Sequence, residues 1–146
     1  AFKGLPHRCQ WVGKVNDVNF YNDSKGTNVG ATLAALEGLK KDSGKIVLIA
    51  GGVGKGADFL PLAQALASSR GVVLIGEDAQ KIATAIGDKA QCQFANNLDE
   101  AVEQALELAL QGDDVLLSPA CASFDMFKGF EDRGNAFVRS VQVVLA

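Results

Sequence analysis

Short apolar runs alternate along the chain with segments in which apolar residues recur every third or fourth position. Apolar runs closed by glycine or polar residues predict buried strands, and the helical spacing predicts amphipathic helices. The predicted strands are 10–15, 18–22, 45–50, 71–76, 90–95 and 114–120. The predicted helices are 27–39, 58–69, 78–86, 98–110 and 131–145.

The order of these elements predicts the fold class. Asn16 and Asp17 separate the first two strands, and such a short polar connection is typical of a β-hairpin. Strand–helix units then repeat, which favours a mainly parallel sheet with helices on both faces. We therefore expect an α/β, Rossmann-like domain of about six strands with an N-terminal hairpin, and a length of 146 residues favours a single domain, 1–146.

In sheets of this kind ligands gather at the carboxyl ends of the strands. The loops of interest are those that follow Asn22, Ala50, Ile75 and Leu117. Three of these loops carry unusual chemistry; the loop after Ile75 does not.

The first such loop lies in YNDSKGTN, residues 21–28. Asp23 has the chemistry to accept from ribose hydroxyls, Lys25 to neutralise phosphate charge, and Thr27 to donate to a carboxylate. The same residues also suit a plain helix start with Asp23 or Thr27 as the N-cap. The two readings are compatible.

The second loop, AGGVGKGADF, invites comparison with a phosphate-binding loop. The Walker pattern fails because Ile49 stands at its first glycine and Gly56 at its hydroxyl position. One reading is a glycine-rich turn before a helix capped by Asp58, with Pro61 in its first turns. The other is that the glycines open the backbone and Lys55 serves as a point charge for a carboxylate or phosphate.

The third loop, LSPACASFDMFKGFEDRG, follows the last apolar strand. Ser123 and neighbouring amides have the chemistry to hold an anion where a helix begins. The alternative is a plain N-cap whose nearby apolar side chains, Phe124, Met126, Phe127 and Phe130, belong to the core. For these apolar side chains core packing is the favoured reading.

The segment LPHR places His7 beside Arg8. A solvated basic pair is the plain reading, and an arginine that binds phosphate oxygens bidentately is the functional one. His7 is the only histidine, so a multi-histidine metal site within this chain is excluded. No pairing of a nucleophile with a base is visible, which disfavours covalent catalysis and leaves positioning and charge stabilisation.

Composition narrows the function classes further. A net charge of −3 and a pI near 5.1 argue against a nucleic-acid binder. Cys9, Cys92 and Cys121 are odd in number and far apart, which suggests reduced thiols rather than disulfides or zinc. No apolar run reaches the roughly 18 residues of a membrane span. The start, AFKGLPHR, lacks a signal-peptide core, so secretion is not indicated, and reduced thiols fit a cytoplasmic protein. It also lacks an initiator Met, which a processed chain or a domain cut from a larger protein would explain, and we favour the second.

Taken together, LPHR, NDSKGTN, AGGVGKGADF and LLSPACASFDMFKGFEDRG resemble the carboxyl-terminal domain of the Mur ligase family over essentially the whole chain. The form DSKGTN resembles the branch that adds D-glutamate. One departure is Val53, where some relatives carry an acidic residue. The family's UDP-binding and central ATPase domains, with the magnesium ligands, have no counterpart in this sequence.

The resemblance implies ATP-dependent ligation of D-glutamate to UDP-N-acetylmuramoyl-L-alanine through an acyl phosphate, by a bacterial and monomeric enzyme. It implies that Arg8, Asp23 and Lys25 contact ATP, and that His7 and Lys25 serve catalysis. It implies a D-glutamate pocket formed by Thr27, Lys55, Ser123, Phe124 and Phe130, the phenylalanines mainly through backbone amides. ATP and Mg²⁺ are the implied cofactors, with no metal ligand in this chain, and the isolated domain is expected to be inactive. The alternative is a stand-alone Rossmann-like nucleotide-binding or regulatory module.

Overall fold

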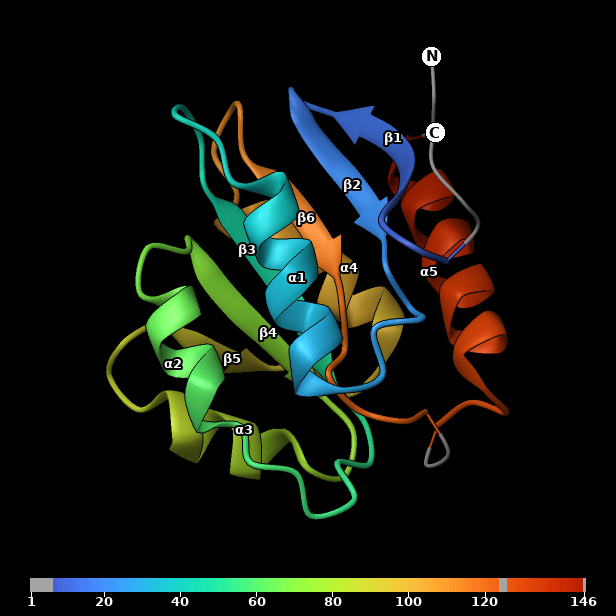
Figure 1. Ribbon diagram of the computed structural model, residues 1–146. Helices are drawn as coiled ribbons and strands as arrows, with labels where there is room; N and C mark the ends of the chain where they lie inside the picture. The colour runs from blue at the N-terminus through green and yellow to red at the C-terminus, as the bar shows by residue number, and fades with distance from the viewer. Residues whose placement is uncertain (1–6, 124–125, 146) are drawn as a thin grey trace.

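The computed structural model describes residues 7–123 and 126–145. Within these residues six strands form one sheet in the order β1-β2-β6-β3-β4-β5, in which β1 runs antiparallel to β2 and all other neighbours are parallel (Figure 1). The strands are β1 (Gln10–Val15), β2 (Val18–Asn22), β3 (Ile46–Gly51), β4 (Gly71–Ile75), β5 (Cys92–Phe94) and β6 (Asp114–Leu117). The helices are α1 (Val29–Leu39), α2 (Leu60–Leu66), α3 (Ala79–Ile86), α4 (Leu98–Leu108) and α5 (Phe130–Leu145). The predicted fold class is confirmed.

The hairpin between β1 and β2 turns at the predicted residues. Asn16 and Asp17 have φ values of 51° and 63°, both in the left-handed region. A two-residue turn with this geometry matches the right-handed twist of the strands on either side, and Asn and Asp tolerate it better than most residues.

The sheet separates two apolar layers. Successive residues of a strand point to opposite faces, so Leu48 packs with α1, α2 and α3 while Val47 and Ile49 pack with α4 and α5. Figure 1 shows α1 in front of the sheet and α4 behind it. All three of these β3 side chains are fully buried. Burial on both faces explains why the central strands read as continuous apolar runs.

The N-cap of α1 differs from the prediction. Asn28 caps this helix, since its side chain accepts from the Ala31 backbone amide at 2.9 Å. Asp23 and Thr27 were the predicted caps, but Thr27 lies outside the helix and the Asp23 carboxylate binds elsewhere. Asp23 and Thr27 therefore take no part in capping α1.

The starts of α2 and α3 also differ from the predictions. Asp58 accepts from the Leu60 amide at 3.0 Å, but the residue at the cap position is Phe59, and α2 ends at Leu66 rather than Ser69. Asp78 precedes α3 and makes no side-chain capping bond to it. Its carboxylate reaches into another loop.

The remaining boundaries shift by a few residues. The strands β5 and β6 are shorter than predicted, α4 ends at Leu108 instead of Leu110, and α5 begins one residue early, at Phe130. The end of β6 at Leu117, rather than Ala120, matters most. It releases the next residues to form a loop at the carboxyl edge of the sheet.

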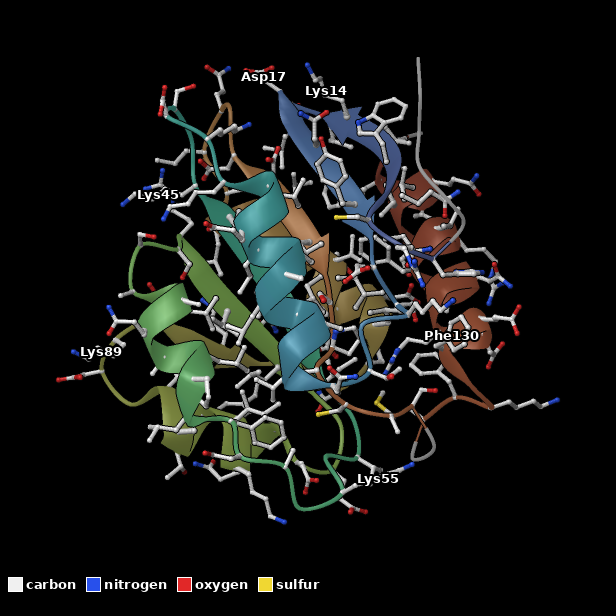
Figure 2. The ribbon with its side chains drawn as sticks, in the orientation of Figure 1. Lys14, Asp17, Lys45, Lys55, Lys89 and Phe130 are labelled. Atoms are coloured by element: carbon white, nitrogen blue, oxygen red, sulfur yellow. The ribbon has the colours of Figure 1, made fainter. Side chains whose placement is uncertain are left out.

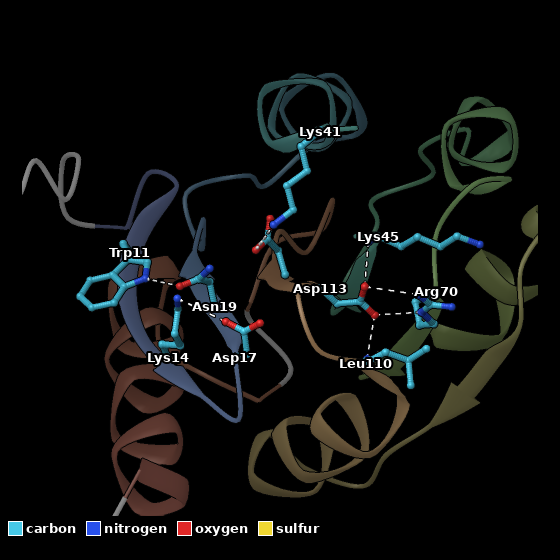
Figure 3. A network of polar contacts seen from close by, with 10 residues as sticks. Trp11, Lys14, Asp17, Asn19, Lys41, Lys45, Arg70, Leu110 and Asp113 are labelled. Carbon is cyan, nitrogen blue, oxygen red and sulfur yellow. Dashed lines mark hydrogen bonds and ion pairs between the residues drawn. The ribbon is translucent and has the colours of Figure 1, made fainter. Parts of the chain in front are cut away.

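The amino edge of the sheet is held by buried charge. Asp113 accepts from the backbone amides of Lys45 and Leu110, both at 2.8 Å, and from the Arg70 guanidinium at 2.8 Å (Figure 3). Burial opposes ionisation of this carboxyl, but the Arg70 guanidinium and the two amides outweigh it and hold the pKa of Asp113 below its ordinary value.

Candidate functional site

Three loops meet at the carboxyl edge of the sheet because β2, β6 and β3 are parallel neighbours. The Ala120 amide of the loop after β6 donates to the Gly26 carbonyl of the loop after β2 at 2.8 Å. Val53 of the loop after β3 pairs with Ala122 through two backbone hydrogen bonds of 2.9 Å. The third loop is thus bonded to both of the others. The three polar loops form one surface.

Asp23 occupies the junction between the first and third loops. One carboxylate oxygen accepts from the Cys9 amide at 3.0 Å, and the other accepts from the Ser118 hydroxyl at 2.7 Å. The side chain belongs to a residue only 6% exposed, and this burial raises the pKa of Asp23. Each oxygen still has a lone pair for a further donor, so the residue fits a hydroxyl ligand.

The Ser118 hydroxyl that binds Asp23 also contacts a second hydroxyl. It lies 3.0 Å from the Thr32 hydroxyl, which donates to the Ser118 carbonyl at 3.1 Å. Both residues are fully buried. The nearby Cys9 thiol is also affected, since burial and then Asp23 raise the pKa of Cys9 to about 11. This cysteine is a neutral thiol at physiological pH.

The His7 ring lies against Asn22, Phe130 and Gly134. The Asn22 amide oxygen accepts from the Ser24 amide at 3.1 Å, which sets the orientation of the Asn22 side chain. Its NH₂ group therefore faces His7 Nδ1, at 3.1 Å, a contact that suits Nδ1 as the acceptor. The ring meets Phe130 edge-on with centroids 6.0 Å apart, and a Cβ on Gly134 would lie 2.2 Å from Nδ1.

The glycine-rich loop approaches backbone on two sides. Gly51 and Gly52 both have φ of 130°, which other residues rarely adopt. A Cβ on Gly51 would lie 1.8 Å from the Ile75 carbonyl, and one on Gly52 would lie 2.2 Å from the Ala122 carbonyl. These glycines let β3 lie close to its neighbours. The glycine run therefore has a structural use that does not require a phosphate.

The predicted cations of the site lie on its solvent side. Lys25 and Lys55 are exposed, as are Arg8 and Thr27. The Lys25 amide donates to the His7 carbonyl at 2.9 Å. Figure 2 shows Lys55 beyond the end of β3, at the edge of the sheet opposite Lys45. Lys55 has φ of 51°, a left-handed conformation that costs a non-glycine residue about 1 kcal/mol or more.

The remaining predicted residues come from the third loop. Ser123 is buried, and its carbonyl accepts from the Phe127 amide at 2.8 Å. Phe130 is half-buried at the start of α5, and its carbonyl accepts from the Ser24 hydroxyl at 2.5 Å. Phe124 lies outside the described residues. Met126 and Phe127 pack against the apolar layer, as the core reading predicted.

Sequence reasoning missed a buried arginine in this site. Arg133 is 1% exposed, and its guanidinium donates to the Ser24 hydroxyl at 3.1 Å, the Ser24 carbonyl at 3.0 Å and the Cys121 carbonyl at 3.0 Å. It joins the first and third loops behind the surface. The arginine lies within the third polar segment, but nothing in its sequence pattern separates a buried arginine from a solvated one.

The part of the chain that the structure describes contains neither a metal-binding cluster nor a membrane-spanning helix. No three His, Cys, Asp or Glu side chains there lie close enough together to hold a metal ion. None of its helices combines the length and the apolar character that crossing a bilayer requires.

A mainly parallel α/β sheet with cations, hydroxyls and a buried carboxylate at its carboxyl edge is typical of domains that bind small anionic or nucleotide ligands there. Residues 7–121 match the family model described as the glutamate ligase domain of Mur ligases. The chain belongs to the Mur ligase family.

Relatives within the family are similar over the whole chain. The UDP-N-acetylmuramoylalanine–D-glutamate ligase of Nitrosococcus oceani is 56% identical and covers 100% of this chain, and the enzyme of the same name from Pseudomonas aeruginosa is 58% identical over 97%. This chain spans 32% of the length of each of these relatives.

Solved structures of the family share the fold. MurF ligase from Thermotoga maritima in complex with ADP aligns with a TM-score of 0.69 at 17% identity, over 99% of this chain and 32% of that one. MurC from the same organism aligns with a TM-score of 0.65 at 17% identity, over 97% of this chain and 31% of that one. At this identity the likeness concerns the fold alone.

Proposed function

We propose that this chain is the D-glutamate-binding domain of an ATP-dependent ligase that joins D-glutamate to UDP-N-acetylmuramoyl-L-alanine. The observation that carries the proposal is the bonding of three polar loops into one surface at the carboxyl edge of the sheet. The two relatives, which cover 97% or more of this chain, bear the name of a D-glutamate ligase, which supports the choice of substrate.

D-Glutamate brings two carboxylates and a nucleophilic amine. Lys55 is the proposed cation for one carboxylate, and Thr27 and Ser123 are the proposed hydroxyl donors. Phe130, the first residue of α5, is proposed to contribute its backbone amide where the helix dipole favours an anion. A backbone amide of Phe124 is proposed as a further donor from the resemblance to the family alone. With the carboxylates held, the amine is left free to point at the acceptor.

The nucleotide is assigned to the other end of the same surface. The proposed contacts are Asp23 to ribose hydroxyls and Arg8 and Lys25 to phosphates, and the two exposed cations and the unused lone pairs of Asp23 fit such a ligand. ATP, when bound, supplies the phosphoryl group that activates the acceptor carboxylate. Lys25 is the proposed catalytic cation at the transferred phosphate, and His7 shapes the same opening.

In the proposed reaction the acceptor carboxylate takes the γ-phosphoryl group and ADP leaves. The D-glutamate amine then attacks the acyl carbon, the new C–N bond replaces the C–O bond to phosphate, and the nitrogen loses a proton. This chain positions the nucleophile and neutralises charge. The magnesium ligands and acceptor-binding residues are assigned to the UDP-binding and central domains of a longer, monomeric enzyme of the bacterial cytoplasm, and the isolated domain is expected to be inactive.

The test is Lys55→Ala in the full-length ligase that contains this chain. Loss of a charged hydrogen bond to a substrate carboxylate is expected to raise KM for D-glutamate about 10- to 100-fold and to leave KM for ATP unchanged. Lys45→Ala is the matched control, because Lys45 is also exposed but lies at the opposite edge of the sheet (Figure 2).

An unchanged KM for D-glutamate in Lys55→Ala would remove Lys55 from the pocket. Calorimetric titration of the chain alone separates the proposal from the stand-alone nucleotide-binding or regulatory module. Tight ATP binding without partner domains, with no ligation by the full-length protein, would favour that module.

A further inference from the structure

The loop after β4 supplies a carboxylate that the sequence analysis overlooked. Asp78 accepts from the Gly54 amide at 2.6 Å through one carboxylate oxygen, and its own amide donates to the Gly52 carbonyl at 3.0 Å. Two bonds therefore tie residue 78 to the glycine-rich loop, on either side of Val53. The residue that follows the bonded Gly54 is Lys55.

The Asp78 carboxylate binds the glycine-rich loop instead of its own helix. The residue is 6% exposed, and although it stands at the cap position of α3 it makes no side-chain capping bond. A good N-cap residue thus forgoes its usual partner, the amides of its own helix, for an amide 24 residues earlier in the chain. Its other carboxylate oxygen lies 3.5 Å from Lys81 Nζ.

The loop needs such an anchor. Gly54 is packed so closely that a Cβ there would lie 2.5 Å from the Phe59 ring, and the next residue, Lys55, holds a left-handed φ of 51°. A non-glycine residue keeps this conformation only where its surroundings enforce it. On the other side the Val53–Ala122 bridge ties the loop to the loop after β6. The carboxylate of Asp78 and this bridge fix the two residues that precede Lys55.

We propose that Asp78 is the positioning residue of the D-glutamate pocket: by holding the Gly54 amide it fixes the backbone from which Lys55 reaches the substrate carboxylate. The inference rests on the proposed function. Asp78 touches neither substrate nor nucleotide in this assignment. It acts through Lys55, and through the left-handed turn on which that lysine stands.

The experiment compares Asp78→Ala, Asp78→Asn and Lys55→Ala in the full-length ligase. Loss of the charged acceptor in Asp78→Ala is expected to raise KM for D-glutamate about 10- to 100-fold, with KM for ATP unchanged. Asp78→Asn should recover most of the loss, because its amide oxygen can still accept from Gly54. If Asp78→Ala does not fold, Asp78→Ser replaces it, since serine can cap α3 but is too short to reach Gly54.

KM for D-glutamate in the double variant Asp78→Ala/Lys55→Ala distinguishes an effect of Asp78 through Lys55 from a general effect on the structure. If Asp78 acts through Lys55, the double variant has the same KM for D-glutamate as Lys55→Ala alone. Asp113→Ala is the matched control: it removes another buried carboxylate that binds backbone amides, but at the amino edge, and is expected to leave KM for D-glutamate unchanged.

Two results would overturn the inference. One is an unchanged KM for D-glutamate in the Asp78 variants while Lys55→Ala raises it, which leaves the proposed function standing. The other is a full additional rise in KM when Asp78→Ala is added to Lys55→Ala. If Lys55→Ala itself has no effect, the proposed pocket fails instead, and the role of Asp78 in it fails with it.

Discussion

Asp23 carries a charge where charge is costly. Burial raises the pKa of Asp23, and the hydrogen bonds from Ser118 and Cys9 and the nearby Arg8 only partly oppose this rise. A carboxyl whose folded-state pKa lies above its unfolded value lowers stability as the pH rises from the unfolded value through the folded one, and the cost is complete above the folded value. Ionised Asp23 therefore costs folding free energy, which fits the proposed role of its carboxylate in ligand binding.

We therefore expect Asp23→Asn to stabilise the chain at neutral pH. Asparagine can still accept from the Cys9 amide, and its NH₂ group can donate to the Ser118 hydroxyl, so both contacts survive without the buried charge. Chemical denaturation across pH is the measurement. Wild type should lose stability relative to the variant as the pH rises above 3.8 and through the higher folded-state pKa.

The same variant should weaken function. In the full-length ligase, loss of the charged acceptor for ribose hydroxyls is expected to raise KM for ATP about tenfold. A variant that is less stable than wild type at neutral pH would contradict the assignment of a net cost to this charge. Ser118→Ala is a useful companion, because it removes one hydrogen bond to Asp23 and leaves the charge in place.

At the scale of elements, the end of β3 depends on the absence of a side chain at Gly51. A Cβ there would lie 1.8 Å from the Ile75 carbonyl of the neighbouring strand, and φ is 130°. Gly51→Ala must displace β3 from β4, and we expect a loss of about 3 kcal/mol or more in unfolding free energy. Thermal or urea denaturation measures it.

Gly56 provides the control within the same loop. It also has positive φ, 74°, but a Cβ added to it would meet no atom within 4 Å beyond its immediate neighbours in the chain. Gly56→Ala is therefore expected to cost only the left-handed backbone term, about 1 kcal/mol. Equal losses for the two variants would mean that the close approach of β3 to β4 is not what requires Gly51.

The central strands could be predicted because burial on both faces leaves a continuous apolar run, as in β3 and β4. Helix starts were harder, since several side chains near each start can serve as caps. Asn28 caps α1, whereas the predicted cap Asp23 instead accepts from the Cys9 amide and the Ser118 hydroxyl, whose residues are 14 and 95 positions away. The spacing of residues in the sequence does not predict contacts between residues so far apart in the chain.

The candidate site could also be predicted only in part from the sequence. Its loops follow from the strand order, because parallel strands place their carboxyl ends on one edge. The residues behind the surface do not follow from it. Residue 78 was predicted only as a helix start and Arg133 was not singled out, and the place of each in the site depends on backbone groups that folding brings near.

At the scale of the whole molecule, the two edges of the sheet have different chemistry. The carboxyl edge holds the three joined loops, whereas at the amino edge Asp113 pairs with Arg70 at 2.8 Å and Asp114 with Lys41 at 3.2 Å (Figure 3). The two edges are separated by the length of the strands. Substitutions at the amino edge should therefore change stability without changing ligand binding.

Asp113→Asn tests this separation. The variant weakens the ion pair with Arg70 and one or more amide contacts of a fully buried side chain, so we expect a loss of about 2 kcal/mol in unfolding free energy near pH 7. The folded-state pKa of Asp113 lies below the ordinary 3.8, so its contribution is complete above that pH and is lost as the pH falls through the folded value. Wild type and variant should therefore converge in stability in acid, while KM for D-glutamate in the full-length ligase stays unchanged. A raised KM would show that the amino edge is coupled to the site, and a stability difference that persists in acid would show that packing, not charge, accounts for the role of Asp113.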